Sequence, residues 1–274
     1  MTHALAASAV LPPAGTLDRI HRLWNDLPDF GAARIEEAML QALRELAALV
    51  DAQQAYWLGT VRLAEHAGDD LARGWRPAAI RFLHPQEFQR RNFKEHKKRI
   101  ERGAVDPGIA ANVARAGEFR VNVKSEMIGP DWFKSDFYRQ MLAPFGVGDT
   151  LHMATPIGED MESWFCFERI GAPEAVDTLP AFGPAERALL EMAGRPLKWL
   201  HRQILLHYGL TLAEKPLTAT ERRLLAGLLG GGSEADIAAE LQLSPTTVHT
   251  YATRLYRKFN VRGRTGLTTL WLGR

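Results

Sequence analysis

The stretch that decides the fold of the C-terminal part of the chain is LTATERRLLAGLLGGGSEADIAAELQLSPTTVHTYATRLYRKFNVRGR, residues 217–264. Its opening predicts a helix with a capping box, in which the Thr218 hydroxyl accepts a hydrogen bond from a backbone N–H and Glu221 returns one. Four leucines give this helix one apolar face: Leu224, Leu225, Leu228 and Leu229. The run Gly230–Gly232 ends it.

Two more helices and a short fourth one follow. Ser233 starts the second helix, whose inward residues are Ile237, Ala238 and Leu241. Ser244 and Pro245 start the third, because serine caps a helix and proline is tolerated at its first position. The inward residues of the third helix are Val248, Leu255 and Phe259, and Asn260 is expected as a left-handed cap. The fourth helix is expected over 264–272.

A short helix, a tight turn and a helix with a threonine-rich start and a basic end form the layout of a helix-turn-helix DNA-binding domain. The free N–H groups and the dipole at a helix start favour phosphate, and basic residues farther along reach flanking phosphates. Charge supports this interpretation. The chain has a net charge of +2, but residues 216–274 carry eight basic and four acidic residues, and no acid follows Ser244. Such a basic end predicts a polyanionic partner.

The same stretch resembles the C-terminal DNA-binding domain of the LuxR family of transcription regulators. The matching residues are Leu217, Thr218, Glu221, Ser233, Ile237, Ala238, Leu241, Ser244, Thr247, Val248, Lys258, Val261 and Arg264. Two positions depart from the family pattern: His249 stands where lysine is usual, and Tyr251 stands where histidine is usual. Region 4 of bacterial sigma factors opens in a similar way, but it normally ends near the recognition helix, whereas an amphipathic helix follows here.

The resemblance implies which residues meet DNA. The side chains that approach the bases are those of His249, Thr250 and Thr253, and those that contact phosphate or fix the register are Thr246, Thr247, Arg254, Arg257 and Lys258. It also implies a dimer contact through the fourth helix, with Leu267, Leu270 and Trp271. Histidine changes its charge between about pH 5 and 8. We therefore expect DNA binding to be tighter at about pH 6 than at about pH 8, and we expect this difference to disappear in His249→Gln.

Residues 16–208 predict an α+β domain in which helices flank an antiparallel sheet. Helices are expected over 16–27, 34–50, 85–102, 130–142 and 184–209, the last bent at Pro196. Strands are expected over 54–64, 77–83, 118–124, 149–157 and 163–170. Residues 1–15 have no basic residue before their apolar run, which is untypical of a signal peptide, so we expect a disordered lead-in there. We expect the linker between the two domains over residues 209–216.

The helix expected over 85–102 is strongly basic and allows two interpretations. It has seven Lys or Arg residues among eighteen and could form a second nucleic-acid contact. Glu87, Glu95 and Glu101 favour the other interpretation, a solvated charged face.

Residues 137–204 resemble the second half of a GAF-like sensor domain. A helix, a Gly-x-Gly-Asp turn, two strands and a long closing helix come in that order. The acyl-homoserine-lactone-binding domain of LuxR-type regulators fits less well, because Asp106-Pro107 is present but no Trp and Tyr precede it at the right distance. A phospho-receiver domain fits poorly, because Asp69-Asp70 lies in a turn.

A small molecule bound by this domain would lie in a mostly apolar cavity between sheet and helices. The candidate lining residues are Trp57, Trp75, Trp132, Phe137, Tyr138, His152 and Trp164. Aromatic side chains of this kind are more often part of the core than ligand contacts.

Other classes of protein are not favoured. The sequence has no nucleophile elbow, no phosphate-binding glycine loop and no metal-ligand spacing, so we expect no enzyme, no cofactor and no metal. The single Cys166 excludes a disulfide within the chain and fits a reducing compartment. No apolar run reaches membrane-spanning length. The sequence therefore predicts a cytoplasmic transcription regulator.

This regulator is expected to bind double-stranded DNA as a homodimer, under the control of a small-molecule effector at the N-terminal domain. An alternative stays open, in which the N-terminal domain is a ligand-free dimerisation or interaction module. Regulation would then be constitutive or depend on a protein partner.

Overall fold

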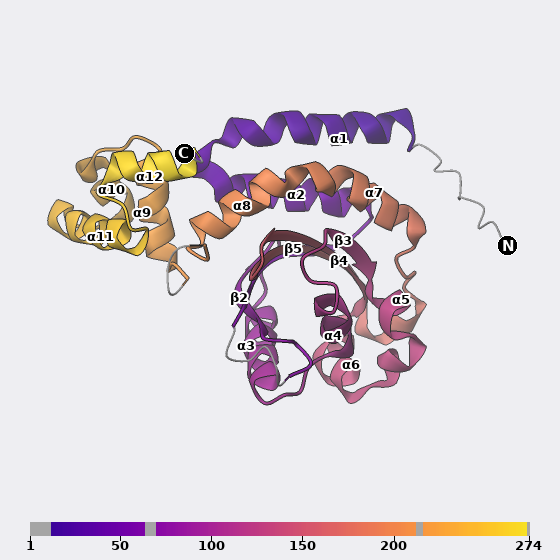
Figure 1. The fold of residues 1–274 in the computed structure, drawn as a ribbon. Coiled ribbons are helices and arrows are strands. Elements are labelled where there is room, and N and C mark those ends of the chain that lie inside the picture. The colour runs from indigo at the N-terminus through magenta and orange to yellow at the C-terminus, as the bar shows by residue number, and fades with distance from the viewer. Residues whose placement is uncertain (1–11, 64–69, 212–215, 273–274) are drawn as a thin grey trace.

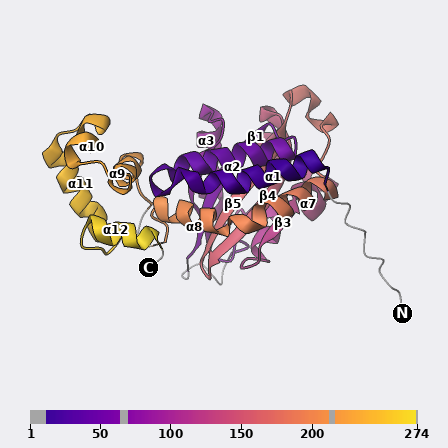
Figure 2. The ribbon, with the colours of Figure 1, turned by 90° about the horizontal axis from the view of Figure 1, so that it is seen from above.

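A computed structural model describes residues 12–63, 70–211 and 216–272, which form two domains (Figure 1). The N-terminal domain has a central sheet with helices on both faces, and the C-terminal domain is a group of four helices at one end of it. Figure 2 shows from above how α1 (Ala14–Asp26) and α2 (Ile35–Leu49) run side by side across the sheet. The structure therefore confirms the predicted α+β domain followed by a helical one.

The sheet has five strands in the order β2-β1-β5-β4-β3, and all neighbours are antiparallel. The strands are β1 (Gln54–Arg62), β2 (Trp75–Phe82), β3 (Arg120–Val123), β4 (Val147–Gly158) and β5 (Met161–Ile170). The predicted hairpin of β4 and β5 is confirmed. Successive side chains point to opposite faces of a sheet, so each long strand contributes to two different environments.

One face of the sheet packs against three helices, and a fourth, α1, lies over these helices on the side away from the sheet (Figure 1); together they form the main core. These helices are α1 (Ala14–Asp26), α2 (Ile35–Leu49), α7 (Pro184–Gly194) and α8 (Lys198–His207). The largest buried side chains from the sheet are Trp57, Leu151, Met153, Phe165 and Phe167. Each contributes about 1.5–3 kcal/mol through burial. A Cβ on Gly194 would lie 2.0 Å from the Met153 sulfur, so glycine at this position allows α7 to approach β4 closely.

The expected bend near Pro196 is confirmed. A 3-10 turn, Arg195–Leu197, separates α7 from α8, because proline lacks the N–H that would continue the helix.

The opposite face of the sheet is covered by α3 (Glu87–Glu101), α4 (Pro107–Val113), α5 (Lys124–Ile128) and α6 (Asp136–Met141). The sequence did not predict α4 or α5. The single helix predicted over 130–142 is wrong, because Ser135 adopts an extended conformation and caps α6 by accepting a hydrogen bond from the Tyr138 N–H at 3.2 Å. A 3-10 turn, Pro130–Lys134, precedes it.

The C-terminal domain consists of α9 (Ala219–Leu229), α10 (Glu234–Leu241), α11 (Pro245–Lys258) and α12 (Arg264–Trp271). The predicted caps of the first two helices are present: Thr218 exchanges hydrogen bonds with Glu221, and Ser233 with Asp236. Asn260 has φ 53°, as expected for a left-handed cap. The Arg264 guanidinium donates to the carbonyls of Leu228 and Gly232 at 2.6 and 2.9 Å and so ties α12 to the end of α9.

Parts of the expected lead-in and linker, residues 1–11 and 212–215, lie outside the described residues. The expectation of disorder up to residue 15 is wrong at its end, because α1 begins at Ala14. The Pro13 carbonyl accepts from the N–H groups of Thr16 and Leu17 and so starts that helix.

Candidate nucleic-acid interface and internal cavity

Helix α11 is fixed on the C-terminal domain by its cap and its apolar face. The Ser244 hydroxyl accepts from the Thr247 N–H at 3.1 Å, and Pro245 occupies the first helical position. The turn from α10 passes through Gln242, which is left-handed with φ 56°. The buried side chains are Val248, Ala252 and Leu255. The opposite face of α11 therefore points to solvent.

This solvent face carries the eight residues predicted to contact DNA. Thr247 and Lys258 are half-buried, and the exposed ones are Thr246, His249, Thr250, Thr253, Arg254 and Arg257. The Lys258 ammonium forms an ion pair with Glu221 of α9, which offsets part of its charge. Arg254 and Arg257 stand on the exposed surface, where cations can reach phosphate.

The threonine hydroxyls on α11 are used within the helix. The Thr250 hydroxyl donates to the Thr246 carbonyl and the Thr253 hydroxyl to the His249 carbonyl, both at 3.0 Å. Such hydrogen bonds to the preceding turn leave the oxygen lone pairs and the methyl group for other contacts. Threonine methyls can contact the methyl group of thymine in the major groove.

His249 has a partner that the sequence did not reveal. Its Nδ1 lies 3.0 Å from a carboxylate oxygen of Glu234, in the first turn of α10. Both side chains are exposed, 69% for His249 and 45% for Glu234. A carboxylate therefore stands beside the predicted DNA-reading side chains.

The predicted dimer contact through Leu267 and Trp271 needs correction. Both side chains are buried in the core of the C-terminal domain, at 0% and 6% exposure, and Leu270 is half-buried against the same core. The Trp271 ring meets Phe259 edge-on at 5.6 Å. A partner could reach Leu267 or Trp271 only if the domain opened.

The second candidate site is a cavity of about 190 Å³ between the sheet and helices α3 to α6. Four of the seven predicted side chains line it: Trp75, Phe137, His152 and Trp164. Further apolar lining comes from Leu58, Ile80, Phe82, Phe88, Phe93, Ile100, Val113, Met141 and Leu142. The described part of the chain holds no group of three or more His, Cys, Asp or Glu side chains placed to bind a metal ion.

The other three predicted side chains lie elsewhere. Trp57 points to the opposite face of the sheet, where its Nε1–H donates to the Ser163 hydroxyl at 2.8 Å. Trp132 and Tyr138 form a small cluster with Val176, and the Tyr138 hydroxyl donates to the Val147 carbonyl. Trp57 faces away from the cavity because successive side chains of a strand point to opposite faces of the sheet. Its neighbours Tyr56 and Leu58 both face the cavity.

One end of the cavity is polar and contains a buried ion pair. The Lys124 ammonium lies 3.5 Å from the Asp106 carboxylate and 4.1 Å from the centre of the Trp132 ring. The Trp132 Nε1–H donates to the same carboxylate at 3.2 Å. Burial opposes ionisation of Asp106, but Lys124 and the Trp132 N–H outweigh it, so the pKa of this carboxyl is lowered. Asp106 also caps α4 by accepting from the Gly108 N–H at 2.8 Å.

Glu168 of β5 is the other carboxyl at this end of the cavity. It is 9% exposed and lines the cavity. Burial raises its pKa to about 7, against the opposing effect of Lys124. Burial also lowers the pKa of His152 to about 3 and that of His96 to about 4. Both histidines are therefore neutral near pH 7.

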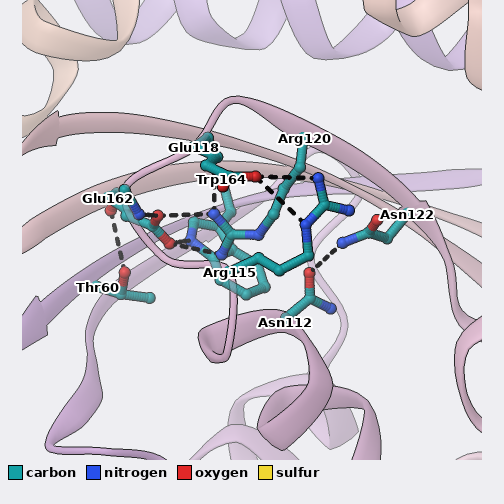
Figure 3. Close-up of polar contacts among 9 residues, drawn as sticks. Thr60, Asn112, Arg115, Glu118, Arg120, Asn122, Glu162 and Trp164 are labelled. Carbon is teal, nitrogen blue, oxygen red and sulfur yellow. Dashed lines mark hydrogen bonds and ion pairs between the residues drawn. The ribbon is translucent and has the colours of Figure 1, made fainter.

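A second buried ion pair supports one wall of the cavity (Figure 3). The Arg120 guanidinium donates to both carboxylate oxygens of Glu162 at 2.7 and 2.8 Å. The Trp164 Nε1–H donates to the same carboxylate at 3.0 Å, which fixes the ring that faces the cavity. Beside this pair, the Asn122 amide donates to the Asn112 side chain at 2.8 Å.

The two domains meet next to Glu36 of α2. Its carboxylate accepts from the Arg81 Nε–H of β2 at 2.8 Å and lies 3.5 Å from Arg222 Nε of α9. The Arg222 guanidinium also stacks over the Tyr208 ring at 4.2 Å. Arg81 lies between Ile80 and Phe82, which both line the cavity. The Glu36 carboxylate therefore connects the cavity wall with the C-terminal domain.

Comparison with known proteins identifies the C-terminal domain. Residues 215–271 match the family of bacterial regulatory proteins described as the luxR family, so this domain is a LuxR-family helix-turn-helix domain. No curated protein matches the chain. No helix within the described ranges combines the length and apolarity needed to cross a bilayer.

Solved structures with a related chain path share little sequence. SdiA in complex with octanoyl-rac-glycerol is 14% identical, covering 96% of each chain with a TM-score of 0.49. Escherichia coli SdiA is 14% identical over 94% of this chain and 96% of that one, with a TM-score of 0.44. The VqsR LBD domain from Pseudomonas aeruginosa is 12% identical over 71% and 98%, with a TM-score of 0.44. Likenesses this weak carry no inference about ligand or target.

Proposed function

We propose that this chain is a sequence-specific, DNA-binding transcription regulator whose N-terminal domain, GAF-like in its order of elements, responds to a small molecule. The observation that carries the proposal is the solvent face of α11. This face carries His249 and two threonines, Thr250 and Thr253, beside the exposed Arg254 and Arg257. It belongs to a domain that matches the luxR family.

In the proposed complex the first turns of α11 enter the major groove. His249, Thr250 and Thr253 face the base edges, and the residues that hold the backbone are Thr246, Thr247, Arg254, Arg257 and Lys258. Two copies of the chain bind as a homodimer in the cytoplasm. Since Leu267 and Trp271 are buried, the dimer contact uses the half-buried Leu270 on α12 and the exposed Leu272 directly after this helix.

Control by an effector is supported by the cavity and by the contacts of Glu36. A ligand in the cavity would touch Ile80 and Phe82 of β2, and Arg81 between them holds Glu36 against Arg222 of the DNA-binding domain. A ligand that moves β2 would thus change how the two domains meet. A ligand shifts such an equilibrium only by its difference in affinity for the two arrangements.

Selection of random-sequence DNA duplexes with the purified full chain tests the proposal. We expect enrichment of a near-palindrome with half-sites about 10 base pairs apart, because two recognition helices of a dimer are spaced by one helical turn. A pool that shows no enriched sequence after repeated rounds would contradict sequence-specific recognition.

A further inference from the structure

Glu168 is a largely buried carboxyl group at the polar end of the cavity, near the charge of Lys124 but without a hydrogen-bond donor of its own. It lies on β5 between Gln54 of β1 and Thr150 of β4. Among the residues that the structure describes, no group donates a hydrogen bond to its carboxylate. The Gln54 side chain is occupied, because its amide donates to the His84 carbonyl at 2.7 Å. Because Glu168 lines the cavity and its carboxylate accepts no hydrogen bond there, it is suited to a hydrogen-bond donor brought by a ligand.

The other charged groups of the cavity are already paired. Lys124 faces Asp106, and Arg76 forms ion pairs with Asp70 and, at 3.3 Å, with Glu101. The remaining titratable groups that face this space are His96, His152, Tyr56 and Cys166. Burial lowers the pKa of both histidines and raises the pKa of the tyrosine and the thiol, so all four are neutral near pH 7. The unbalanced charge of an ionised cavity is therefore the negative charge of Glu168.

The walls of the cavity also favour a cation. Aromatic side chains come from the sheet and from α3 and α6: Tyr56, Trp75, Phe82, Phe88, Phe93, Phe137 and Trp164. The face of an aromatic ring attracts an ammonium group, and more strongly where water is excluded. Lys124, which lines the cavity, shows this preference: its ammonium lies 5.7 Å from the ring centre of Phe137 in the cavity wall and 4.1 Å from that of Trp132, outside the lining.

We propose that the effector is a small apolar molecule with a protonated amine, whose ammonium group donates to the Glu168 carboxylate while its apolar body packs against α3. The proposal rests on the proposed role of the cavity as an effector site. A cavity of about 150 Å³ admits benzene, so the cavity of about 190 Å³ suits one ring with a short chain. A carboxylate ligand is disfavoured, since it would meet Glu168 and would have to displace Asp106 from Lys124.

Three probes of similar shape separate these possibilities: 2-phenylethylamine, 2-phenylethanol and 3-phenylpropanoate. Isothermal titration calorimetry of the full chain at about pH 7.5 should give the tightest binding for the amine. The alcohol should bind about tenfold more weakly, as expected when a charged hydrogen bond is lost, and the carboxylate more weakly still. Tightest binding by the carboxylate, equal binding of all three probes, or no binding of the amine up to millimolar concentration would overturn the proposal.

Glu168→Gln keeps the shape of the side chain and removes its charge. In this variant we expect the amine to lose its advantage over the alcohol, while the alcohol binds as before. The matched control is Glu174→Gln, an exposed residue outside the cavity, which should leave all three affinities unchanged. A preference for the amine that survives in a folded Glu168→Gln would contradict the assignment.

Proton release gives a second readout. Because burial raises the Glu168 pKa to about 7, binding the ammonium at about pH 6 requires a proton to leave this carboxyl. Titrations in two buffers of different ionisation enthalpy should report this release for the wild type and none for Glu168→Gln. Equal release by both proteins would contradict the role of Glu168. DNA affinity of the ligand-free chain is measured separately, so failure of the amine site is distinct from failure of DNA binding.

Discussion

Arg222 of the C-terminal domain lies 3.5 Å from the carboxylate of Glu36 in the N-terminal domain. Burial opposes ionisation of Glu36, but the nearby His207, whose Nε2 lies 3.7 Å away, the charge of Arg222 and the hydrogen bond from Arg81 outweigh it and lower its pKa from 4.5 to about 2. A carboxyl with a lowered pKa stabilises the folded state above its ordinary pKa. The contribution is lost as the pH falls from about 4.5 to about 2.

Glu36→Gln is therefore expected to lower the free energy of unfolding by about 2 kcal/mol at near-neutral pH, the usual scale for hydrogen bonds to a charged group. The difference from the wild type should shrink as the pH falls through the window given above. Urea unfolding at about pH 6 and about pH 3 measures both quantities. The neighbouring, exposed Glu37→Gln is the control and should show little change. A difference that stays constant with pH would refute the role given to the ionised Glu36.

The two Arg–Glu pairs in Figure 3 should differ strongly in their contribution to stability. Arg120 and Glu162 are fully buried, whereas the Arg115 and Glu118 side chains are 58% and 64% exposed. Glu162→Gln leaves a buried guanidinium without its counter-charge and should cost about 3–5 kcal/mol. Glu118→Gln should cost less than about 1 kcal/mol. Chemical denaturation measures the free energy of unfolding of both variants. A similar loss of stability in both would contradict the expected difference between a buried and an exposed ion pair.

The C-terminal domain could be predicted closely because its signals are local. Thr218 with Glu221, Ser233, and Ser244 with Pro245 define the helix starts within a few residues of sequence, and the structure contains each cap. The partner of His249 was not predictable in this way. Glu234 lies fifteen residues away, and only the packing of α10 on α11 brings the two side chains together.

The cavity could be predicted only in part, because polar and charged side chains line it beside the apolar ones. The face of α3 that lines the cavity includes Gln89, Asn92 and His96 beside its aromatic residues. The hydrophobic periodicity of this helix is therefore weak, and its sequence resembles that of a solvent-exposed helix. Lys124 and Glu168 look like ordinary charged residues in the sequence. Their burial follows from the packing of α5 and β5 around the same space, which no local pattern reports.

The contact between His249 and Glu234 sharpens the expected effect of pH on DNA binding. Protonated His249 adds positive charge to α11, but the Glu234 carboxylate beside it repels phosphate. We expect His249→Gln to remove the tighter binding at low pH and Glu234→Gln to tighten binding at both about pH 6 and about pH 8. Fluorescence anisotropy with a labelled duplex gives these affinities. If wild type and His249→Gln have the same pH profile, His249 acts only as a neutral hydrogen-bonding or packing group.

The central claim is that α11 carries the DNA contact, and the salt dependence of DNA affinity tests it most directly. The logarithm of the association constant should fall linearly with the logarithm of salt concentration, by about 0.9 per phosphate contact. Arg254→Ala with Arg257→Ala should therefore reduce the slope by about 2. The matched control is Arg90→Ala with Arg91→Ala on the exposed side of α3, which should leave the slope unchanged. An unchanged slope in the α11 variant, or an equal loss in the α3 variant, would contradict the claim.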